Sequence, residues 1–196
     1  MRKVKVKRKT HETEIEIALN LDGQGKYDIK TKISFLDHML AQLAKHGLFD
    51  LQLKARGDLD VDIHHTNEDI GIALGQAFKK ALGSKAGLVR FGFAYSILDE
   101  AEARCVVDIS GRAFLDINPL KKRLKGENYS FSYFHQFLRA FVHAAQISLH
   151  VDILKGDDFH HILESCFKAL ALSLRQACQK DKRKKGIPST KGRIEA

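Results

Sequence analysis

The sequence predicts an α+β protein of two pseudo-symmetric halves, each a β-sheet with helices packed on one face. Stretches with strand-like patterns precede and separate four amphipathic helical stretches. One histidine-rich motif also occurs once in each half, each time followed by an Ala-rich helical stretch. We therefore expect 1–196 to form a single domain that arose by internal duplication, with halves of approximately 1–90 and 91–196.

The individual elements follow from local periodicity. Strands are expected where apolar and polar residues alternate or β-branched residues accumulate, in TEIEIALNL, YDIKTKI, FDLQLKAR, LDVDI, FAYSILDEAEARCVVDI, RAFLDI and ISLHVDIL. Helices are expected where apolar residues recur at spacings of three and four, at 35–46, 66–82, 130–145 and 159–179. The glycines of LDGQGK indicate a turn.

Composition restricts the class of protein. A chain of 196 residues with 44% hydrophobic content can bury a real core. Its three cysteines lack C-x-x-C spacing, so we expect neither a disulfide framework nor a thiolate zinc site. No stretch has the pattern of a membrane span or a signal peptide. We expect a soluble, cytoplasmic protein without membrane partners.

The net charge of +9 raises the possibility of a nucleic-acid-binding protein. Basic residues concentrate in MRKVKVKRK, KKRLK and KDKRKKG. These runs lack interleaved aromatic residues, and no nucleic-acid-binding motif accompanies them. Solvated basic ends, or attraction of a small phosphorylated substrate, explain the charge equally well, and we expect no nucleic-acid partner.

The stretch DIHHTNED places two adjacent histidines shortly before a glutamate. On a helix Glu68 shares a face with both His64 and His65, because residues three and four apart are neighbours. The histidines themselves point about 100° apart, so each can reach a different metal ion. The alternative interpretation is a solvated first turn, in which the polar residues of this stretch cap the helix.

The stretch DDFHHILES repeats this pattern as His160, His161 and Glu164. The two histidine pairs lie 96 residues apart, whereas pairing the apolar strands through Leu51 and Leu149 gives an offset of 98. The difference falls in the glycine-containing loops before the motifs, where changes in length are tolerated. Two copies of one ligand set predict a two-metal centre.

The same offset of 98 pairs His38, in FLDHM, with Gln136. Imidazole and carboxylate ligands without thiolates suit manganese, iron, cobalt, nickel or zinc, and a mixed nitrogen and oxygen set favours octahedral geometry. A metal ion with open positions can polarise a bound substrate or ionise a bound group.

Five ordered motifs carry a resemblance to a known family. FLDHM, HHTNEDIGIALG, DEAEARCVVDISGR, HHILES and PSTKG resemble the imidazoleglycerol-phosphate dehydratases of histidine biosynthesis, and the resemblance covers nearly the whole chain. It implies a lyase with two Mn²⁺ ions per active site. It also implies a homo-oligomer of twenty-four subunits with octahedral symmetry and with sites between subunits.

The reaction implied by the resemblance removes water from D-erythro-imidazole glycerol phosphate and gives imidazole acetol phosphate. The hydrogen that is lost sits on an unactivated carbon. Binding of the imidazole to a cation favours the anionic ring, which can expel the neighbouring hydroxyl and leave that hydrogen acidic. A carboxylate can then accept the proton.

The resemblance also assigns roles to individual residues. It implies that the metal ligands are His38, His64, His65, Glu68, His160, His161 and Glu164. Glu12, in HETEI, resembles the acid/base glutamate of the family, and we expect Glu68 and Glu164 to share in catalysis. The residues that resemble the substrate-binding set are Glu12, His38, Arg90, Arg112, Ser189 and Lys191. Guanidinium and ammonium groups suit phosphate oxygens.

One position departs from the family. Many relatives have a metal-binding histidine where this chain has Gln136, with His135 just before it. The apolar pattern of YFHQFL favours Gln136 facing the site, with its carbonyl oxygen as the ligand, while a local helix shift would present His135 instead. A two-metal hydrolase of another class remains the alternative function, since it would share both histidine motifs.

Overall fold

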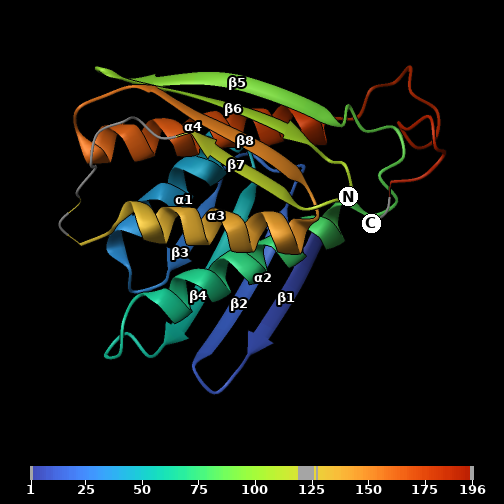
Figure 1. The fold of residues 1–196 in the computed structure, drawn as a ribbon. Coiled ribbons are helices and arrows are strands. Elements are labelled where there is room, and N and C mark those ends of the chain that lie inside the picture. The colour runs from blue at the N-terminus through green and yellow to red at the C-terminus, as the bar shows by residue number, and fades with distance from the viewer. Residues whose placement is uncertain (1, 119–125, 127, 195–196) are drawn as a thin grey trace.

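The computed structural model describes residues 2–118, 126 and 128–194 (Figure 1). The first half contains β1 (Lys3–Lys9), β2 (Thr13–Asn20), β3 (Tyr27–Lys30), α1 (Ser34–Gly47), β4 (Asp50–Gly57) and α2 (His64–Leu82). The second half contains β5 (Phe91–Leu98), β6 (Ala101–Asp108), β7 (Phe114–Asn118), α3 (Phe131–Ala145), β8 (Ser148–Lys155) and α4 (Phe159–Cys178).

The two halves have the same topology. Each runs through three strands, a helix, a strand and a helix, and the sheet orders β1-β2-β4-β3 and β5-β6-β8-β7 correspond strand by strand. In both sheets the last pair is parallel and the others are antiparallel. The predicted α+β class with two similar halves is confirmed. The internal duplication stays a prediction, with which this topology agrees.

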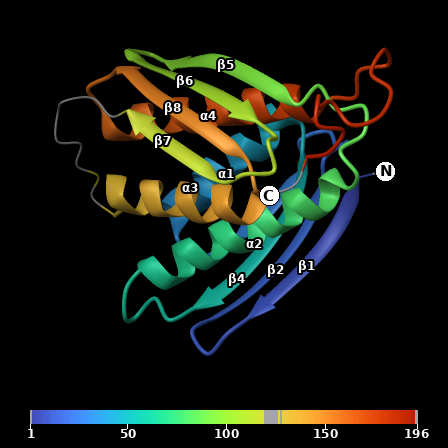
Figure 2. The ribbon, with the colours of Figure 1, turned by 45° about the vertical axis from the view of Figure 1, so that its right-hand side comes forward.

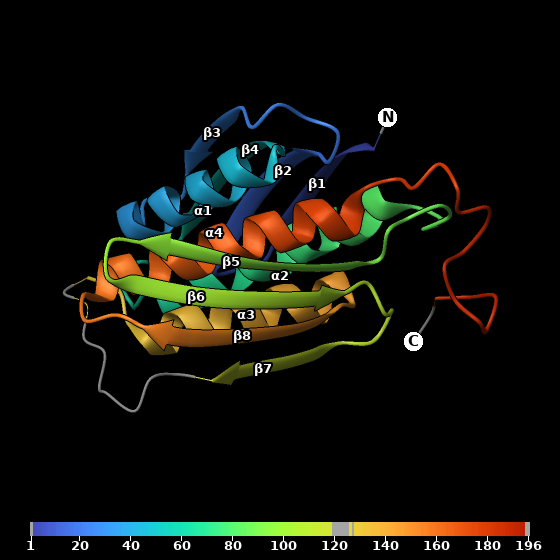
Figure 3. The same cartoon turned by 90° about the horizontal axis from the view of Figure 1, so that it is seen from above.

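The helices lie between the two sheets (Figures 1 and 2). Helix α2 packs on β1 and β2, and α4 packs on β5 and β6. The two layers of helices meet as α2 against α3 and α1 against α4, so each contact between helix layers joins the halves. Figure 3 shows the second sheet covering α3 and α4. A T-shaped contact between Phe78 and Phe141, with centroids 5.3 Å apart, lies in the shared core.

Helices α2 and α3 approach closely because α2 carries two glycines on the facing side. A Cβ atom at Gly71 would lie 2.7 Å from the carbonyl oxygen of Phe137, and one at Gly75 would lie 2.5 Å from that of Phe141. Both distances are shorter than real Cβ contacts. The absence of two side chains therefore sets the spacing of this helix pair.

All four predicted helices are confirmed, with ends within two residues of those expected. The predicted strand LDVDI is wrong: residues 59–61 form a turn in which the Val61 N–H donates to the Asp58 carbonyl oxygen, and Val61 is exposed. The stretch alternates in polarity, but among the described residues no strand pairs with it. The long stretch FAYSILDEAEARCVVDI forms a hairpin of β5 and β6 that turns at Asp99, where φ is 47°.

Strand β1 was not predicted, because MRKVKVKRK was interpreted only by its charge. Its lysines at alternate positions are exposed, while Val4 and Val6 pack against the core. The basic run KKRLK lies outside the described residues. The three cysteines are buried and unpaired. Among the described helices, none has the length and apolar character needed to cross a membrane.

Candidate metal centre

All four helices begin at one end of the molecule. The ring of Phe35, in the first turn of α1, lies 5.1 Å from that of Tyr129, just before α3, and 5.9 Å from that of Phe159, the first residue of α4. The Tyr129 hydroxyl donates to Asn67 in the first turn of α2 over 2.6 Å. The histidine motifs at the starts of α2 and α4 are therefore held at the same end.

Capping residues fix where the two motifs enter their helices. Asp158 is the N-cap of α4, and its carboxylate accepts a hydrogen bond from the His161 backbone N–H over 3.0 Å. Asp62 accepts one from the His64 backbone N–H at the start of α2. Carboxylates at these positions satisfy N–H groups that have no partner within the helix.

One cluster combines ligands from both halves. His38 on α1 and His160 on α4 direct their Nε2 atoms to the same Oε2 atom of Glu164, at 2.8 and 3.2 Å. One potential ligand atom from each of the three residues lies within 4.8 Å of the others. This convergence depends on the packing of α1 against α4, which the sequence pattern did not predict.

Lys168 supports the charge of this cluster. Its Nζ atom lies 2.7 Å from Oε1 of Glu164, one helical turn away. Burial alone would raise the pKa of Glu164, but hydrogen bonds from Lys168 and His38 outweigh it and hold the pKa at about 2. Glu164 is therefore ionised near neutral pH, as a carboxylate ligand must be.

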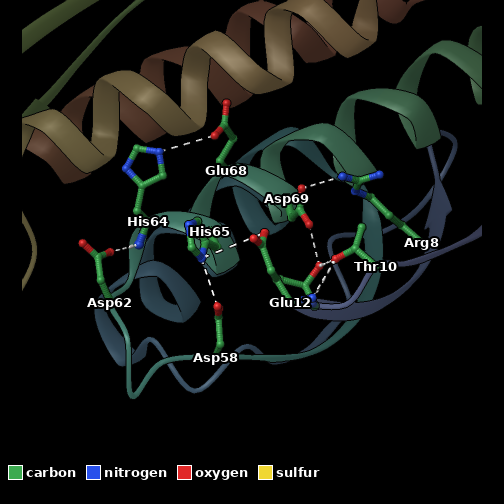
Figure 4. A network of polar contacts seen from close by, with 10 residues as sticks. Arg8, Thr10, Glu12, Asp58, Asp62, His64, His65, Glu68 and Asp69 are labelled. Carbon is green, nitrogen blue, oxygen red and sulfur yellow. Dashed lines mark hydrogen bonds and ion pairs between the residues drawn. The ribbon is translucent and has the colours of Figure 1, made fainter.

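The corresponding cluster on α2 and α3 is more open. His64 Nε2 lies 3.4 Å from Oε2 of Glu68 (Figure 4). The other carboxylate oxygen of Glu68 lies 3.6 Å from the Arg139 guanidinium. Gln136 is half-buried, and its Oε1 atom is buried without a hydrogen-bond partner among the described residues, whereas His135 is exposed. The structure thus turns Gln136 inward; its role as a ligand stays a prediction.

His65 and His161 point away from these clusters. Each ring is nearly perpendicular to that of the preceding histidine, at 81° for the first pair and 87° for the second. His65 Nδ1 lies 2.9 Å from Oδ2 of Asp58, and His161 Nδ1 lies 2.8 Å from Oε2 of Glu100. The adjacent histidines therefore diverge, as the helical spacing predicted.

These carboxylates change the protonation of their partners. The hydrogen bond between His65 and Asp58 raises the pKa of His65. The hydrogen bond between His161 and Glu100 likewise raises the pKa of His161. In turn, the hydrogen bond from His161 and those from backbone N–H groups lower the pKa of Glu100 to about 2. Each pair thus resembles the pairs in which a carboxylate accepts a hydrogen bond from a metal-binding histidine.

Glu12 lies beside the first of these pairs, in the turn between β1 and β2 (Figure 4). Its carboxylate is 3.9 Å from His65 Nδ1, and 55% of its side chain is exposed. This distance is too long for a direct hydrogen bond. The carboxylate is therefore accessible to solvent beside His65.

The donor set fits a first-row divalent metal ion. Imidazole nitrogens and an ionised carboxylate converge at Glu164, and the unpartnered amide oxygen of Gln136 is a further oxygen donor. Mixed nitrogen and oxygen ligands suit manganese and the neighbouring first-row ions better than soft thiolate ligands do. All eight predicted ligands lie on α1, α2, α3 or α4, within the first two turns of each helix.

A cavity of about 300 Å³ contains the predicted phosphate-binding residues. It is lined by Arg90, Ser110, Arg112, Ser189, Thr190, Lys191, Arg193 and Ile194. The structure thus brings together all four residues proposed to bind phosphate, from the segment just before β5, the loop between β6 and β7, and the C-terminal segment. Ser110 and Arg193 were not singled out from the sequence.

Arg90 is held in place by several partners at the edge of this cavity. Its Nε and one terminal nitrogen donate to Asp108 over 2.7 and 3.0 Å, and the other terminal nitrogen donates to the Pro188 carbonyl oxygen over 2.9 Å. A guanidinium has five N–H donors, so two remain. Its position is fixed before any anion arrives.

The cavity beside Arg90 and the cluster around Glu164 lie at opposite ends of α4 within one chain. The Arg90 backbone N–H donates to the carbonyl oxygen of Ala177 over 3.0 Å, near the end of the helix. Glu164 lies thirteen residues earlier, which corresponds to roughly 20 Å along a helix. A small substrate cannot contact both sites of the same chain.

Sequence reasoning missed three residues that shape the centre: Asp58, Glu100 and Lys168. An alignment of the β1–β2 turn with the β5–β6 turn would have found Glu100, because Glu12 stands at the equivalent position. Lys168 lies four residues after Glu164, a spacing that predicts a contact on a helix. No sequence pattern indicates Asp58, which lies in the loop between the predicted strands FDLQLKAR and LDVDI.

Comparisons of the sequence with known proteins all give one family. The family model of imidazoleglycerol-phosphate dehydratase matches residues 31–174. The chain is 54% identical over 193 residues to the imidazoleglycerol-phosphate dehydratase of Thermoanaerobacter pseudethanolicus, which covers 98% of this chain and 99% of that protein. With the Acidithiobacillus ferrooxidans protein of that name, the identity is 50% over 194 residues, or 98% of each chain.

Solved structures show the same similarity. The crystal structure of IGPD from Pyrococcus furiosus in complex with (S)-C348 superposes with a TM-score of 0.84 at 32% identity, over 96% of this chain and 100% of that chain. Imidazoleglycerol-phosphate dehydratase from Staphylococcus aureus gives a TM-score of 0.80 at 34% identity, over 90% and 98%.

Proposed function

The chain belongs to the imidazoleglycerol-phosphate dehydratase family of hydro-lyases, and on that premise we propose that it dehydrates D-erythro-imidazole glycerol phosphate to imidazole acetol phosphate. This step serves L-histidine biosynthesis, with the cytoplasm as its proposed location. The single observation that carries the proposal is the convergence of His38, His160 and Glu164 from two halves of the chain.

Two Mn²⁺ ions are the proposed cofactors. The residues that would hold them are His38, His64, His65, Glu68, Gln136, His160, His161 and Glu164. A divalent ion there would supply positive charge that favours the deprotonated form of the substrate imidazole. The chain contributes the ionised carboxylate of Glu164 and imidazoles already oriented by hydrogen bonds.

The remaining residues of the site bind the substrate and move protons. Lys191, Arg112 and Ser189 bind the phosphate together with Arg90, whose position Asp108 and Pro188 fix. Glu12 accepts the proton from carbon, and the hydroxyl leaves with a proton as water. Glu68 and Glu164 provide the carboxylates next to the imidazole clusters. The phosphate is remote from the broken bonds, so its binding energy positions the reacting carbon.

The active site is proposed to lie between copies of this chain. The distance of roughly 20 Å along α4 separates the metal ligands from the phosphate cavity within one chain. A neighbouring copy must therefore supply one of the two parts. This requirement supports the homo-oligomer of twenty-four subunits implied by the family resemblance.

The outer face of β5 offers a surface for that neighbour. Phe91, Phe93, Tyr95 and Ile97 are each more than half exposed along this edge strand. Each leaves roughly 100 Å² uncovered, which together is typical of an interaction site on a monomer. Phe91 packs under the Arg90 guanidinium, 4.7 Å from its ring centroid. A copy docked on β5 would therefore lie next to the phosphate cavity.

Turnover with the purified protein tests the proposed function. With Mn²⁺ added, we expect imidazole glycerol phosphate to be consumed with formation of a ketone and without release of inorganic phosphate. A two-metal hydrolase would instead release phosphate from the substrate. Mass photometry tests the assembly, and a monomer that turns over fully would contradict a site shared between copies.

A further inference from the structure

The two halves place a glutamate at the same structural position. Lys3 pairs with Asn20 across β1 and β2, and Phe91 pairs with Asp108 across β5 and β6. Both residues of the second pair lie 88 positions after those of the first. The same shift carries Glu12 onto Glu100, and each stands directly before the second strand of its half.

The two equivalent glutamates have different surroundings. Glu100 Oε2 lies 2.8 Å from His161 Nδ1, and its Oε1 accepts hydrogen bonds from the backbone N–H groups of Asp157 and Asp158 over 3.2 and 3.0 Å. Glu12 lies 3.9 Å from Nδ1 of the equivalent His65. Its side chain is 55% exposed, against 38% for Glu100. One glutamate is fixed and the other is not.

Asp58 accounts for the difference. Its Oδ2 atom lies 2.9 Å from His65 Nδ1, where Glu100 stands in the second half, and the Asp58 side chain is only 24% exposed (Figure 4). Since one ring nitrogen carries only one hydrogen, Asp58 takes the hydrogen bond that Glu12 would otherwise make. Glu12 is left without that constraint.

A carboxylate at Nδ1 decides which ring nitrogen is available. A neutral imidazole has one N–H, and a carboxylate that accepts from Nδ1 keeps the proton there, which leaves the lone pair on Nε2. Metal-binding histidines commonly donate their second N–H to a carboxylate in this way. His65 and His161 are therefore both prepared to bind a metal ion through Nε2.

We propose that Glu100 is a positioning residue that holds Nδ1 of His161 and presents Nε2 to a metal ion, and that Asp58 does so for His65, which frees Glu12 for proton transfer. This inference rests on the proposed function, because it assumes that both histidines bind metal. Equivalent glutamates thus have different tasks in the two halves.

Glu100→Gln separates the orientation of His161 from the support of its loop. The glutamine oxygen can still accept from the Asp157 and Asp158 N–H groups. Its amide N–H₂ would donate to Nδ1, and the ring proton would then move to Nε2, where it blocks metal binding. We expect Mn²⁺ affinity to fall about 10- to 100-fold, with no change in the melting temperature of the metal-free protein. Asp58→Asn should have a similar effect through His65.

The binding measurement uses the full chain and Mn²⁺ alone. Electron paramagnetic resonance counts the free ion during a titration, so affinity is read without turnover. Glu102→Gln is the matched control, because Glu102 stands two residues further along and pairs with exposed Lys155 at 3.0 Å. Its Mn²⁺ affinity should equal that of the original chain.

Steady-state kinetics then separate the two glutamates. For Glu100→Gln, kcat should recover as Mn²⁺ is raised to saturation, because the defect lies in metal binding. For Glu12→Gln, Mn²⁺ affinity should be unchanged and kcat should stay low at any Mn²⁺ concentration. This division between affinity and rate distinguishes a positioning residue from a proton-transfer residue.

Several outcomes would overturn the inference. Unchanged Mn²⁺ affinity in Glu100→Gln would do so, as would a lowered melting temperature without a change in affinity. Equal loss of affinity in Glu12→Gln would refute the division of tasks. If the original chain bound no Mn²⁺, both this inference and the proposed cofactor would fail. Normal binding in the original chain with normal binding in Glu100→Gln would refute the inference alone.

Discussion

The cluster between α1 and α4 and the cluster between α2 and α3 occupy equivalent places between the two halves, yet only the first is closed. Glu164 contacts His38, His160 and Lys168 at 2.7 to 3.2 Å. Glu68 contacts His64 and Arg139 at 3.4 and 3.6 Å. The fold sets the positions of the ligands, while the side chain opposite each glutamate decides how tightly they converge.

The edge strands β1 and β5 also have equivalent positions but different side chains. Exposed positions of β1 carry Lys3, Lys5, Lys7 and Lys9, and the equivalent positions of β5 carry Phe91, Phe93, Tyr95 and Ile97. Lysines along an edge strand discourage pairing with another chain, whereas an apolar edge favours it. The equivalent strands thus have different surroundings: β1 faces solvent, and β5 is proposed to contact a neighbouring copy of the chain.

Removing one ligand from each cluster should have the largest effect. We expect His160→Ala and His64→Ala each to lower kcat/KM by more than about 100-fold. Loss of a residue that only hydrogen-bonds to a metal ligand usually lowers affinity or activity by about 10- to 100-fold, and loss of a ligand should have a larger effect. Metal analysis should show fewer bound ions in both. His46→Gln is the control, since His46 bonds to Gln42 near the other end of α1. Full activity in either alanine variant would remove that cluster from the site.

Substitutions in the proposed phosphate-binding cavity should affect KM rather than metal binding. Lys191→Ala should raise KM about 10- to 100-fold, because a hydrogen bond to a charged group contributes about 1.5 to 3 kcal/mol. Metal affinity should stay the same, since Lys191 is not among the proposed metal ligands. Lys182→Ala removes the same charge from an exposed position of the C-terminal segment and should leave KM unchanged. Equal effects would indicate general attraction of the phosphate rather than a specific contact.

Local sequence patterns predicted the helices that carry the proposed ligands better than the arrangement of those side chains. Helical spacing sufficed for the divergence of His64 and His65, because it is a local property of one helix. The convergence of His38 with Glu164 depends on the packing of α1 against α4, which no local pattern specifies. The strand β1 was missed because alternating lysines were interpreted by their charge, although their period of two is that of a strand.

Replacing the amide in the open cluster should make the two clusters more alike. We expect Gln136→His to strengthen the weaker of two metal-binding steps by about tenfold, or about 1.4 kcal/mol, because imidazole is the stronger ligand for a first-row ion. Titration of Mn²⁺ into stripped protein measures both steps. His135→Ala should leave the titration unchanged, since His135 is exposed. Loss of one ion in His135→Ala, with normal binding in Gln136→Ala, would show that the two residues exchange roles.

A smaller effect should appear in the stability of the metal-free protein at acid pH. The pKa of Glu164 is about 2 in the folded chain against an ordinary value of 4.5. A lowered pKa stabilises the folded state above pH 4.5, and the contribution is lost as the pH falls toward 2. Between these limits, the free energy of unfolding should fall less steeply with acid for Glu164→Gln. Urea unfolding over this range measures the difference, and identical slopes would contradict the ion pairing of Glu164 with Lys168.

Gly71 and Gly75 affect the proposed metal centre, although neither has a side chain that could bind a metal ion or substrate. A methyl group at Gly75 would meet a backbone oxygen of α3 at 2.5 Å, so α3 would have to move and carry Gln136 with it. Mutational tolerance at these two positions is therefore low for a reason that no inspection of ligands would reveal. In a genetic screen, alanine at either glycine would be grouped with the loss of a ligand, although neither glycine can bind a metal ion through a side chain.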